Sequence, residues 1–321
     1  MLADANSPVT VAFLASIPIY LIIIVGWVSR RVGWVTPSMD KGFMKIAIEL
    51  CYPCLILERM MGNELLRSPL YSLKAVGVGA GICLLSILIC LLIAKLIKLR
   101  VGEGARTFAI ASAVQNYSFF IIPLVAILYG AENDPTMGVL FTHNVGFEFT
   151  LWTVGLLVMS EATKFSPRLL LRGPIIAVLL GLFLVWTGLD QTLVPEPVIG
   201  TMEMLGGCAV PLSLFLVGTT MFDLIGKFKW SLKISLGGVV ARCMILPAII
   251  LAIAYFLPLD PVLKRVLVFQ AAVPAAILPI IIARHFGGRP EVAVEVVVAT
   301  TVFSLISLPF WLSMGFSLIG R

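Results

Sequence analysis

Residues 115–123 read QNYSFFIIP, and this stretch lies inside an apolar run that otherwise has the character of a membrane-spanning helix. Two adjacent amides, a phenol and a hydroxyl are costly in lipid unless they find partners. Pro123 lacks an amide proton and clashes with the preceding turn, so it frees a backbone carbonyl. Such a carbonyl is tolerated at membrane depth only where the backbone faces protein or a water-filled cavity. The stretch therefore predicts a discontinuous helix beside a polar cavity.

The composition excludes a water-soluble protein. The chain has 321 residues, of which 60% are hydrophobic and 12% charged, and its mean hydropathy is +1.07. An ordinary soluble domain is about 45–50% apolar and about 25% charged. The first apolar run, residues 9–28, is longer than the roughly 7–15 residues of a signal peptide's apolar region, so it stays as a membrane span. These features predict an all-α polytopic membrane protein.

Ten apolar segments are long enough to span a bilayer, which takes about 20 residues of helix. They lie at about residues 8–29, 42–61, 74–97, 107–129, 136–159, 173–190, 204–224, 232–256, 263–284 and 292–316. Charged or turn-forming residues separate them. We therefore expect ten transmembrane helices.

The distribution of basic residues orients the spans. With the N-terminus outside, 16 of the 23 Lys and Arg residues fall on the inner side, six fall on the outer side, and Arg242 lies within a span. Cytoplasmic loops of membrane proteins carry an excess of Lys and Arg. This bias also explains the net charge of +6 without a nucleic-acid partner. The sequence predicts a multi-pass protein of the plasma or inner membrane, with both termini extracellular or periplasmic.

Weak markers recur at one spacing in the two halves of the chain. They are CYP at 51–53 and CAVP at 208–211, SLK at 72–74 and at 231–233, and DP at 134–135 and RP at 289–290. Their spacing is about 155–159 residues, as expected of an internal repeat. Five spans per half is an odd number, so the second repeat enters the membrane upside down. We expect two inverted five-helix repeats, residues 1–160 and 173–321.

Spans four and nine occupy matching positions in the two repeats, and both contain prolines with amides before them. Pro123 follows Gln115 and Asn116 in span four, and Pro274 follows Gln270 in span nine. Inverted repeats whose discontinuous helices meet at mid-membrane are the architecture of secondary transporters. The broken middles of these two spans are the expected binding site.

Seven stretches along the chain carry a resemblance to a known family. They are GWVSRRVGWV at 26–35, YPCLIL at 52–57, QNYSFFIIPLVAILYG at 115–130, LWTVG at 151–155, ARCMILP at 241–247, AAVPAAILPIIIARHFGG at 271–288 and TTVFSLISLPFW at 300–311. Through them the sequence resembles the auxin efflux carrier family of membrane transporters, which includes bacterial members and the plant PIN-formed auxin carriers. That family looks like a branch of the bile/arsenite/riboflavin transporter-like superfamily.

The resemblance implies a scaffold of spans one, two, six and seven and a transport domain of spans three to five and eight to ten. It also implies elevator-type alternating access and an organic anion as cargo, a small carboxylate or an auxin-like acid. Asn116 and Pro123 then fall on the span-four crossover and Pro274 on the span-nine crossover. Two positions depart from the family pattern. Ser118 stands where many relatives have glycine, and Leu278 stands in a region where a polar residue, commonly Asn, is usual.

Glu148 and Arg242 are ionisable residues near the middles of spans five and eight. Such residues are expensive in a bilayer and mark functional sites or buried pairs. One interpretation is an ion pair that joins the two halves. The other has Arg242 balancing a substrate carboxylate and Glu148 carrying a proton. Asn144 lies four residues before Glu148 on the same helix face, and His143 is a further candidate for binding a proton.

The candidate site therefore contains two sets of residues. The expected substrate-binding residues are Asn116, Gln115, Tyr117, Pro123, Pro274, Gln270 and Arg242, and the expected coupling residues are Glu148, His143 and Asn144. We expect no cofactor and no metal, because no cysteine or histidine cluster has the spacing of a metal site.

The function expected from these patterns is secondary active transport of a small organic anion by a protein surrounded by membrane lipids. The coupling ion stays open, and a sodium-coupled organic-anion symporter of the bile-acid type is the alternative. A homodimer through the scaffold helices is also open. An intramembrane enzyme is the weaker alternative, because no HExxH, GxSxG or paired-aspartate motif occurs.

Overall fold

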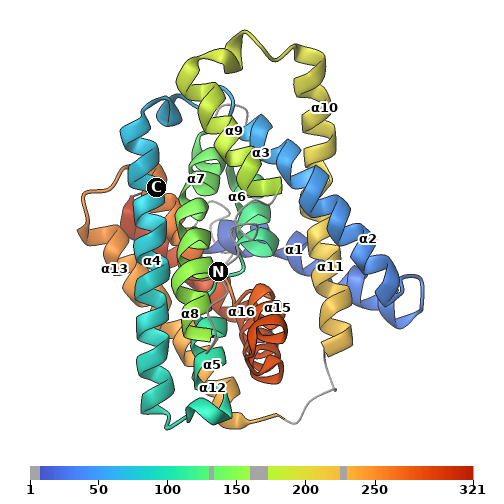
Figure 1. Ribbon diagram of the computed structural model, residues 1–321, viewed down its shortest axis with the longest axis vertical. Coiled ribbons are helices and arrows are strands. Elements are labelled where there is room, and N and C mark those ends of the chain that lie inside the picture. Colours follow the sequence, from blue (N-terminus) through green and yellow to red (C-terminus); the bar gives the residue numbers. More distant parts are fainter. Residues whose placement is uncertain (1–7, 130–133, 160–172, 225–229, 321) are drawn as a thin grey trace, which may run out of the picture.

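The computed structural model describes residues 8–129, 134–159, 173–224 and 230–320. Throughout these ranges the regular elements are helical, and the one extended pairing is an isolated bridge between Gln115 and Ala275. Figure 1 shows α4 (Pro69–Leu96) along one side of the molecule and α10 (Glu196–Gly207) with α11 (Ala209–Leu224) along the other. The expectation of an all-α protein is confirmed.

The other helices follow the chain in order. They are α1 (Pro8–Arg31), α2 (Pro37–Ile46), α3 (Tyr52–Met60), α5 (Ala105–Ala113), α6 (Ile122–Tyr129), α7 (Thr136–Thr150), α8 (Leu156–Met159), α9 (Gly173–Thr187), α12 (Leu232–Val240), α13 (Leu246–Phe256), α14 (Pro261–Ala272), α15 (Leu278–Phe286) and α16 (Pro290–Ile319). Four π-helical turns lie at η1 (Ala47–Cys51), η4 (Tyr117–Ile121), η5 (Leu151–Gly155) and η8 (Ala241–Ile245). The turns η1, η5 and η8 connect α2 to α3, α7 to α8, and α12 to α13, and η4 leads directly into α6.

Four helical rods within the described ranges are long and apolar enough to cross a membrane, by length and composition. They cover residues 69–96, 196–224, 232–256 and 290–319, and shorter apolar helices cover 117–129 and 173–187. These rods agree with expected spans, apart from the start of span seven. That span was expected to begin near residue 204, but the helix already begins at Glu196. The reason is local, because Pro197 in the first turn needs no amide hydrogen bond there and favours a helix start.

The helices pack in two groups. In the first group, residues 8–60 and 173–224, α1 lies along α11, and α3 contacts α9 and α10. In the second group, residues 69–129, 134–159 and 230–320, α4 packs along α5 and α7, and α16 packs against α5, α12 and α14. The groups meet where α1 contacts α16 and α6, and where α3 contacts α7. Each group therefore combines helices from both halves of the chain.

A backbone-to-backbone contact joins α1 and α11 in the first group. A Cβ atom at Gly26 would overlap the carbonyl of Phe215, and one at Gly218 would overlap the carbonyl of Ile23. Small residues allow this approach in a membrane, where van der Waals packing replaces the hydrophobic driving force between helices. The two glycines therefore set the spacing of these helices.

The same arrangement joins α4 and α7 in the second group. A Cβ atom at Gly79 would overlap the carbonyl of His143, and one at Gly146 would overlap the carbonyl of Val76. Since α7 also carries Glu148, this contact positions candidate site residues as well as the helix itself.

A buried arginine ties three helices of the first group together at one end. Arg30, near the end of α1, is buried and donates to the Val35 carbonyl at 2.6 Å. Its guanidinium also pairs with Asp40 of α2 and, at 3.3 Å, with Asp223 of α11. Thr219 of α11 donates to the Asp40 carboxylate at 3.4 Å. The cluster fixes the positions of α2 and α11 against α1.

Replacing Arg30 with methionine is expected to lower the free energy of unfolding by about 2 kcal/mol, because it leaves two carboxylates without their cation. Thermal unfolding of the purified protein in detergent measures this loss as a lower midpoint. Arg31→Met is the matched control, since Arg31 is exposed and stacks over the Trp27 ring at 5.4 Å. Equal shifts in the two variants would contradict the role assigned to Arg30.

Candidate functional site

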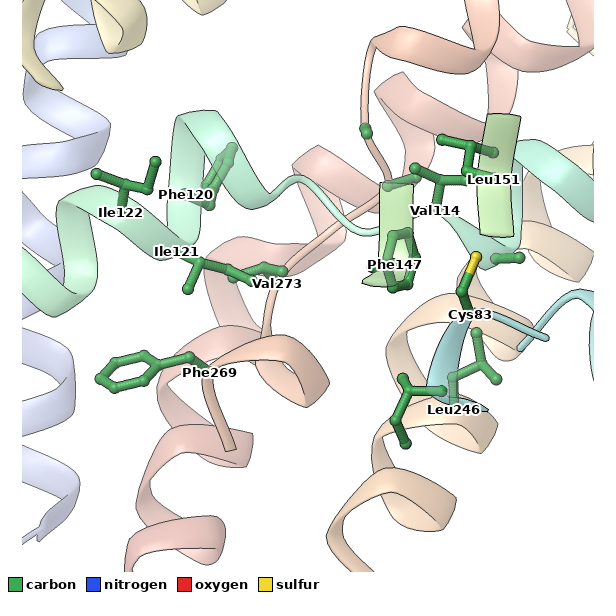
Figure 2. Close-up of a cluster of buried hydrophobic side chains, with 14 of the residues drawn as sticks. Cys83, Val114, Phe120, Ile121, Ile122, Phe147, Leu151, Leu246, Phe269 and Val273 are labelled. Carbon is green, nitrogen blue, oxygen red and sulfur yellow. The ribbon is translucent and has the colours of Figure 1, made fainter. Parts of the chain in front are cut away.

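Two helices are broken near their middles, and their irregular segments cross. The chain is non-helical at residues 114–116, between α5 and η4, and at residues 273–277, between α14 and α15. These two segments are called the crossover below. Figure 2 shows Val114 and Val273 on them, within a cluster of buried apolar side chains that includes Phe147. Both breaks fall inside the segments 107–129 and 263–284 that were expected as spans four and nine.

Backbone hydrogen bonds join the two crossover segments. The Asn116 N–H donates to the Pro274 carbonyl at 2.8 Å, and the Ala276 N–H donates to the Val114 carbonyl at 2.9 Å. A broken helix would otherwise leave such groups without partners at membrane depth, where water does not satisfy them. The crossing therefore stabilises both breaks at once.

Local sequence explains where helix resumes after each break. Asn116 is the N-cap of helix 117–129, and its Oδ1 accepts a hydrogen bond from the Phe119 N–H at 3.3 Å. Pro279 lies in the first turn of α15, where a missing amide proton costs nothing. Pro123 does not mark the break, although the sequence suggested it. It lies in α6 directly after the wide turn η4, which has already replaced the regular helical hydrogen bonds.

A small cavity of about 70 Å³ lies beside the crossover. Its polar lining residues are Gln115, Asn116, Tyr117, Ser118, Asn144 and Glu148, and its apolar lining residues are Val114, Phe119, Phe147, Leu151, Ala276, Ile277 and Leu278. The volume is several times the roughly 10–15 Å³ that a cavity needs to hold one water molecule. It therefore suits a small polar group such as a carboxylate. The polar side chains come from the span-four segment and α7, whereas the span-nine segment contributes apolar side chains and backbone.

Two helix N-termini border this cavity. Tyr117 and Ser118 open helix 117–129, and Leu278 opens α15. The first N–H groups of a helix have no partner within the helix and carry partial positive charge. Helix N-termini are for this reason favourable surroundings for an anion.

Gln115 offers further hydrogen-bonding capacity at the cavity. Its side chain is 2% exposed, and neither its Nε2 nor its Oε1 has a hydrogen-bond partner within the described part of the chain. Buried polar side chains in native proteins are normally hydrogen-bonded, and leaving one unpaired costs about 1–3 kcal/mol. The amide is therefore suited to bind a polar cargo group.

Glu148 is the one carboxylate among the residues that line the cavity. It is partly buried on α7, and its Oε1 accepts a hydrogen bond from the Asn144 Nδ2 at 3.1 Å. The two side chains lie one helical turn apart, as their spacing predicts. Glu148 therefore places a carboxylate beside the crossover.

Three other predicted residues form a separate cluster that does not line the cavity. Gln270 donates from Nε2 to the His143 Nδ1 at 2.9 Å. Arg242 donates from Nε to the Val273 carbonyl at 2.9 Å and from Nη2 to the Gln270 carbonyl. All three predicted side chains are fully buried. The ion pairs found in the described residues do not include Arg242 with Glu148, so these two groups have separate surroundings.

Tyrosines of the first group reach the second group in contacts that the sequence alone did not reveal. The Tyr52 hydroxyl donates to the Ser118 carbonyl at 2.6 Å and lies 2.8 Å from the Ser213 Oγ. The Tyr20 hydroxyl donates to the Ser304 carbonyl at 2.9 Å. An intramembrane tyrosine beside a proline, as in YPCLIL, signals a polar contact but does not identify the backbone carbonyl that accepts it.

A family comparison covers nearly the whole chain. A family model described as "Membrane transport protein" matches residues 11–168 and 162–312. The chain belongs to this family. The resemblance to auxin efflux carriers that the sequence stretches carry is thereby confirmed.

Individual relatives of this membrane transport protein are archaeal and plant proteins. An uncharacterized transporter of Methanothermobacter thermautotrophicus is 24% identical over 301 residues, which cover 91% of this chain and 95% of the relative. An uncharacterized transporter of Methanocaldococcus jannaschii is 21% identical over 300 residues, with the same two coverages. Auxin efflux carrier component 8 of Arabidopsis thaliana is 25% identical over 192 residues, 58% of this chain and 47% of the plant protein. Family and relatives together indicate a multi-pass membrane transporter.

Proposed function

We propose that this protein is a secondary active transporter that moves a small organic anion across the cell membrane by an elevator-type movement. The observation that carries the proposal is the crossover of two broken helices beside a small cavity that two helix N-termini border. Discontinuous helices of this kind form the binding sites of secondary transporters. Membership of a transporter family supports the same function.

The proposed architecture has ten spans in two inverted five-helix repeats, residues 1–160 and 173–321, with both termini extracellular or periplasmic. The first group of helices corresponds to the proposed scaffold and the second group to the proposed transport domain. The packing supports this division, because each group draws helices from both halves and has its own glycine contact. During transport the second group, which contains the whole cavity, would slide along the first.

The proposed cargo is a small carboxylate or the carboxylate end of an auxin-like acid. Amide side chains at Gln115 and Asn116 supply hydrogen-bond donors, and the helix N-termini supply partial positive charge. Apolar side chains such as Phe147 and Leu151 cover the rest of the wall. One relative is named an auxin efflux carrier, which agrees with a cargo of this class.

Thermal unfolding of the purified protein tests the cargo class. Acetate, malonate, malate and indole-3-acetate are added over a range of concentrations, each beside its uncharged amide. A ligand that binds only the folded protein raises the unfolding midpoint as its concentration passes the dissociation constant. We expect at least one acid to stabilise the protein while its amide does not. Stabilisation by none of the acids would contradict the proposed cargo class.

We propose that transport is coupled to a proton that Glu148 carries. The carboxylate lines the cavity, and its Asn144 partner is able to bond to either protonation state. His143 bonds to Gln270 outside the cavity, so its position supports a structural role better than a proton-carrying one. Sodium coupling is the alternative, since the same cavity offers carboxylate and amide oxygens.

Glu148→Gln is expected to lower accumulation driven by a pH gradient about tenfold, because glutamine keeps the volume and the Asn144 contact but exchanges no proton. Proteoliposomes with pH and sodium gradients imposed separately measure this, and exchange at equal pH should persist in the variant. Glu295→Gln is the matched control, since Glu295 is also buried but binds Ser231 and Ser235 at the start of α12. Stimulation by a sodium gradient alone would overturn proton coupling.

A further inference from the structure

The crossover brings together four helix ends whose partial charges nearly cancel. α5 and α14 end there, and helix 117–129 and α15 begin there. Each helix end carries about half an elementary charge, negative at the C-terminus and positive at the N-terminus. The partial charges of two positive and two negative helix ends add up to about zero. The helix ends alone therefore give the site little net preference for an anion.

Arg242 changes this balance. It lies in η8 of rod 232–256 and is fully buried. Its guanidinium donates to the carbonyl of Gln270, in the last turn of α14, and to that of Val273, the C-cap residue of this helix. A cation at a helix C-terminus compensates the partial negative charge of that end. An arginine also keeps its charge at neutral pH, so the compensation is permanent.

No acidic side chain neutralises this cation in the part of the chain that the structure describes. The ion pairs there involve Arg30, Arg59, Arg67 and Arg265, but not Arg242. Its Nη1 also lacks a hydrogen-bond partner among those residues. An isolated buried charge is costly, and in membrane spans such charges mark functional positions. A purely structural cap would not need a full charge, since neutral side chains and backbone amides also cap helix ends.

We propose that Arg242 is a positioning residue that sets the charge selectivity of the crossover without touching the cargo. It fixes the end of α14, and through it the segment 273–277, of which Ala276 and Ile277 line the cavity. Because its charge offsets the partial negative charge of the helix C-termini, the partial positive charge of the two helix N-termini predominates at the cavity. This inference rests on the proposed function, because it concerns the same site and the same class of cargo.

The contacts of Arg242 separate this role from direct binding of a carboxylate. A guanidinium that recognises a carboxylate does so with two parallel N–H groups. Here Nε and Nη2 are occupied by backbone carbonyls, and Arg242 is not among the residues lining the cavity. Replacing Arg242 should therefore change the preference of the protein for an acid over its uncharged amide, rather than remove one specific contact with the cargo.

The test measures binding of an acid and its uncharged amide to the same purified protein by calorimetry. The probes are malonate with malonamide and indole-3-acetate with indole-3-acetamide, and the pair whose acid binds the wild-type protein is used. The ratio of the two affinities reports charge selectivity. In Arg242→Gln we expect this ratio to fall at least about tenfold, because a unit charge in the protein interior contributes strongly at short range. In Arg242→Lys we expect the ratio to persist while both affinities fall, because lysine keeps the charge but not the planar fork.

Arg265→Gln is the matched control. Arg265 is a cation on the same half-helix α14, near its other end, where it pairs with Asp134 at 3.6 Å. Its removal should leave the affinity ratio unchanged. Arg242→Met replaces Arg242→Gln where the glutamine variant does not fold, and Arg242→Lys provides an independent measurement in either case.

The outcomes distinguish this inference from the proposed function. A folded Arg242→Gln or Arg242→Met variant with the wild-type ratio would overturn the role of Arg242, as would a tenfold loss of the ratio in Arg242→Lys. Wild-type protein that binds no acid of the panel would instead overturn the proposed function.

Discussion

Replacing Asn116 with alanine is expected to lower transport about 100-fold and to destabilise the protein by about 1 kcal/mol, because this residue has two roles. Its Oδ1 caps helix 117–129 through the Phe119 N–H. Its side chain also lines the cavity and is 2% exposed. Alanine removes the cap and the amide donor together. Transport of the acid that binds best, measured in proteoliposomes, reports the first effect, and thermal unfolding reports the second.

Asn116→Ser separates the two roles. Serine is as good an N-cap as asparagine, but it lacks the amide group. We therefore expect Asn116→Ser to unfold near the wild-type midpoint and yet to lose transport as severely as Asn116→Ala. Wild-type affinity in Asn116→Ala, or normal transport in Asn116→Ser, would contradict the placement of the site at this residue.

Replacing Gly79 with leucine is expected to reduce the yield of folded, monodisperse protein at least about tenfold, because overpacking a close helix contact forces the backbones apart. A Cβ atom at this position would already overlap the His143 carbonyl. The separation would move α7, and with it Asn144 and Glu148, away from the crossover. Gel filtration of the detergent-solubilised protein measures the yield.

Gly81→Leu is the control for the effect of the larger side chain. Gly81 lies two residues along the same helix, is exposed, and has no described atom within 4 Å of a Cβ built on it. Leucine there should be tolerated and should favour helix slightly. Equal loss of folded protein in both variants would show that leucine in this run of glycines is harmful for a reason other than the α4–α7 contact.

The breaks in spans four and nine were predictable because their signals are local. Amides, prolines and an N-cap asparagine within a few residues indicate where a membrane helix is interrupted. The same local character explains why most expected spans agree with the observed helices. The helix of span seven begins earlier than expected because the two prolines and one acid at residues 195–197 suggested a loop, whereas a proline in a first turn also starts a helix.

The composition of the site was less predictable, because it depends on helix phase and on backbone partners. The break falls at residues 114–116 rather than at Pro123, and this sets which faces of helix 117–129 meet the cavity. Arg242 illustrates the second difficulty. Its partners are backbone carbonyls in the last turn and at the C-cap of α14, and a sequence shows side chains but not which carbonyls are free. The pattern singled out Arg242 and left open an ion pair with Glu148 or contact with a substrate carboxylate, but it gave no sign of these backbone partners.

The close contacts between helices were also hard to predict from the sequence. The run GVGAG at 77–81 contains three glycines, yet only Gly79 meets a backbone atom of a neighbouring helix among the described residues. The other glycine of the α4–α7 contact is Gly146, and it is an isolated glycine in the sequence. Which glycine meets the backbone of the neighbouring helix depends on the rotation of both helices about their axes, and that rotation is a property of the tertiary packing.

The crossover cavity is proposed to bind and carry a small organic anion. Counterflow in proteoliposomes tests this proposal most directly, because uptake of label then requires the carrier but no ion gradient. Vesicles loaded with an unlabelled acid that stabilises the purified protein are diluted into a trace of the labelled acid. We predict that wild-type protein transiently concentrates the label inside and that Asn116→Ser does not. Equal uptake by both proteins, or none by the wild type, would contradict the account.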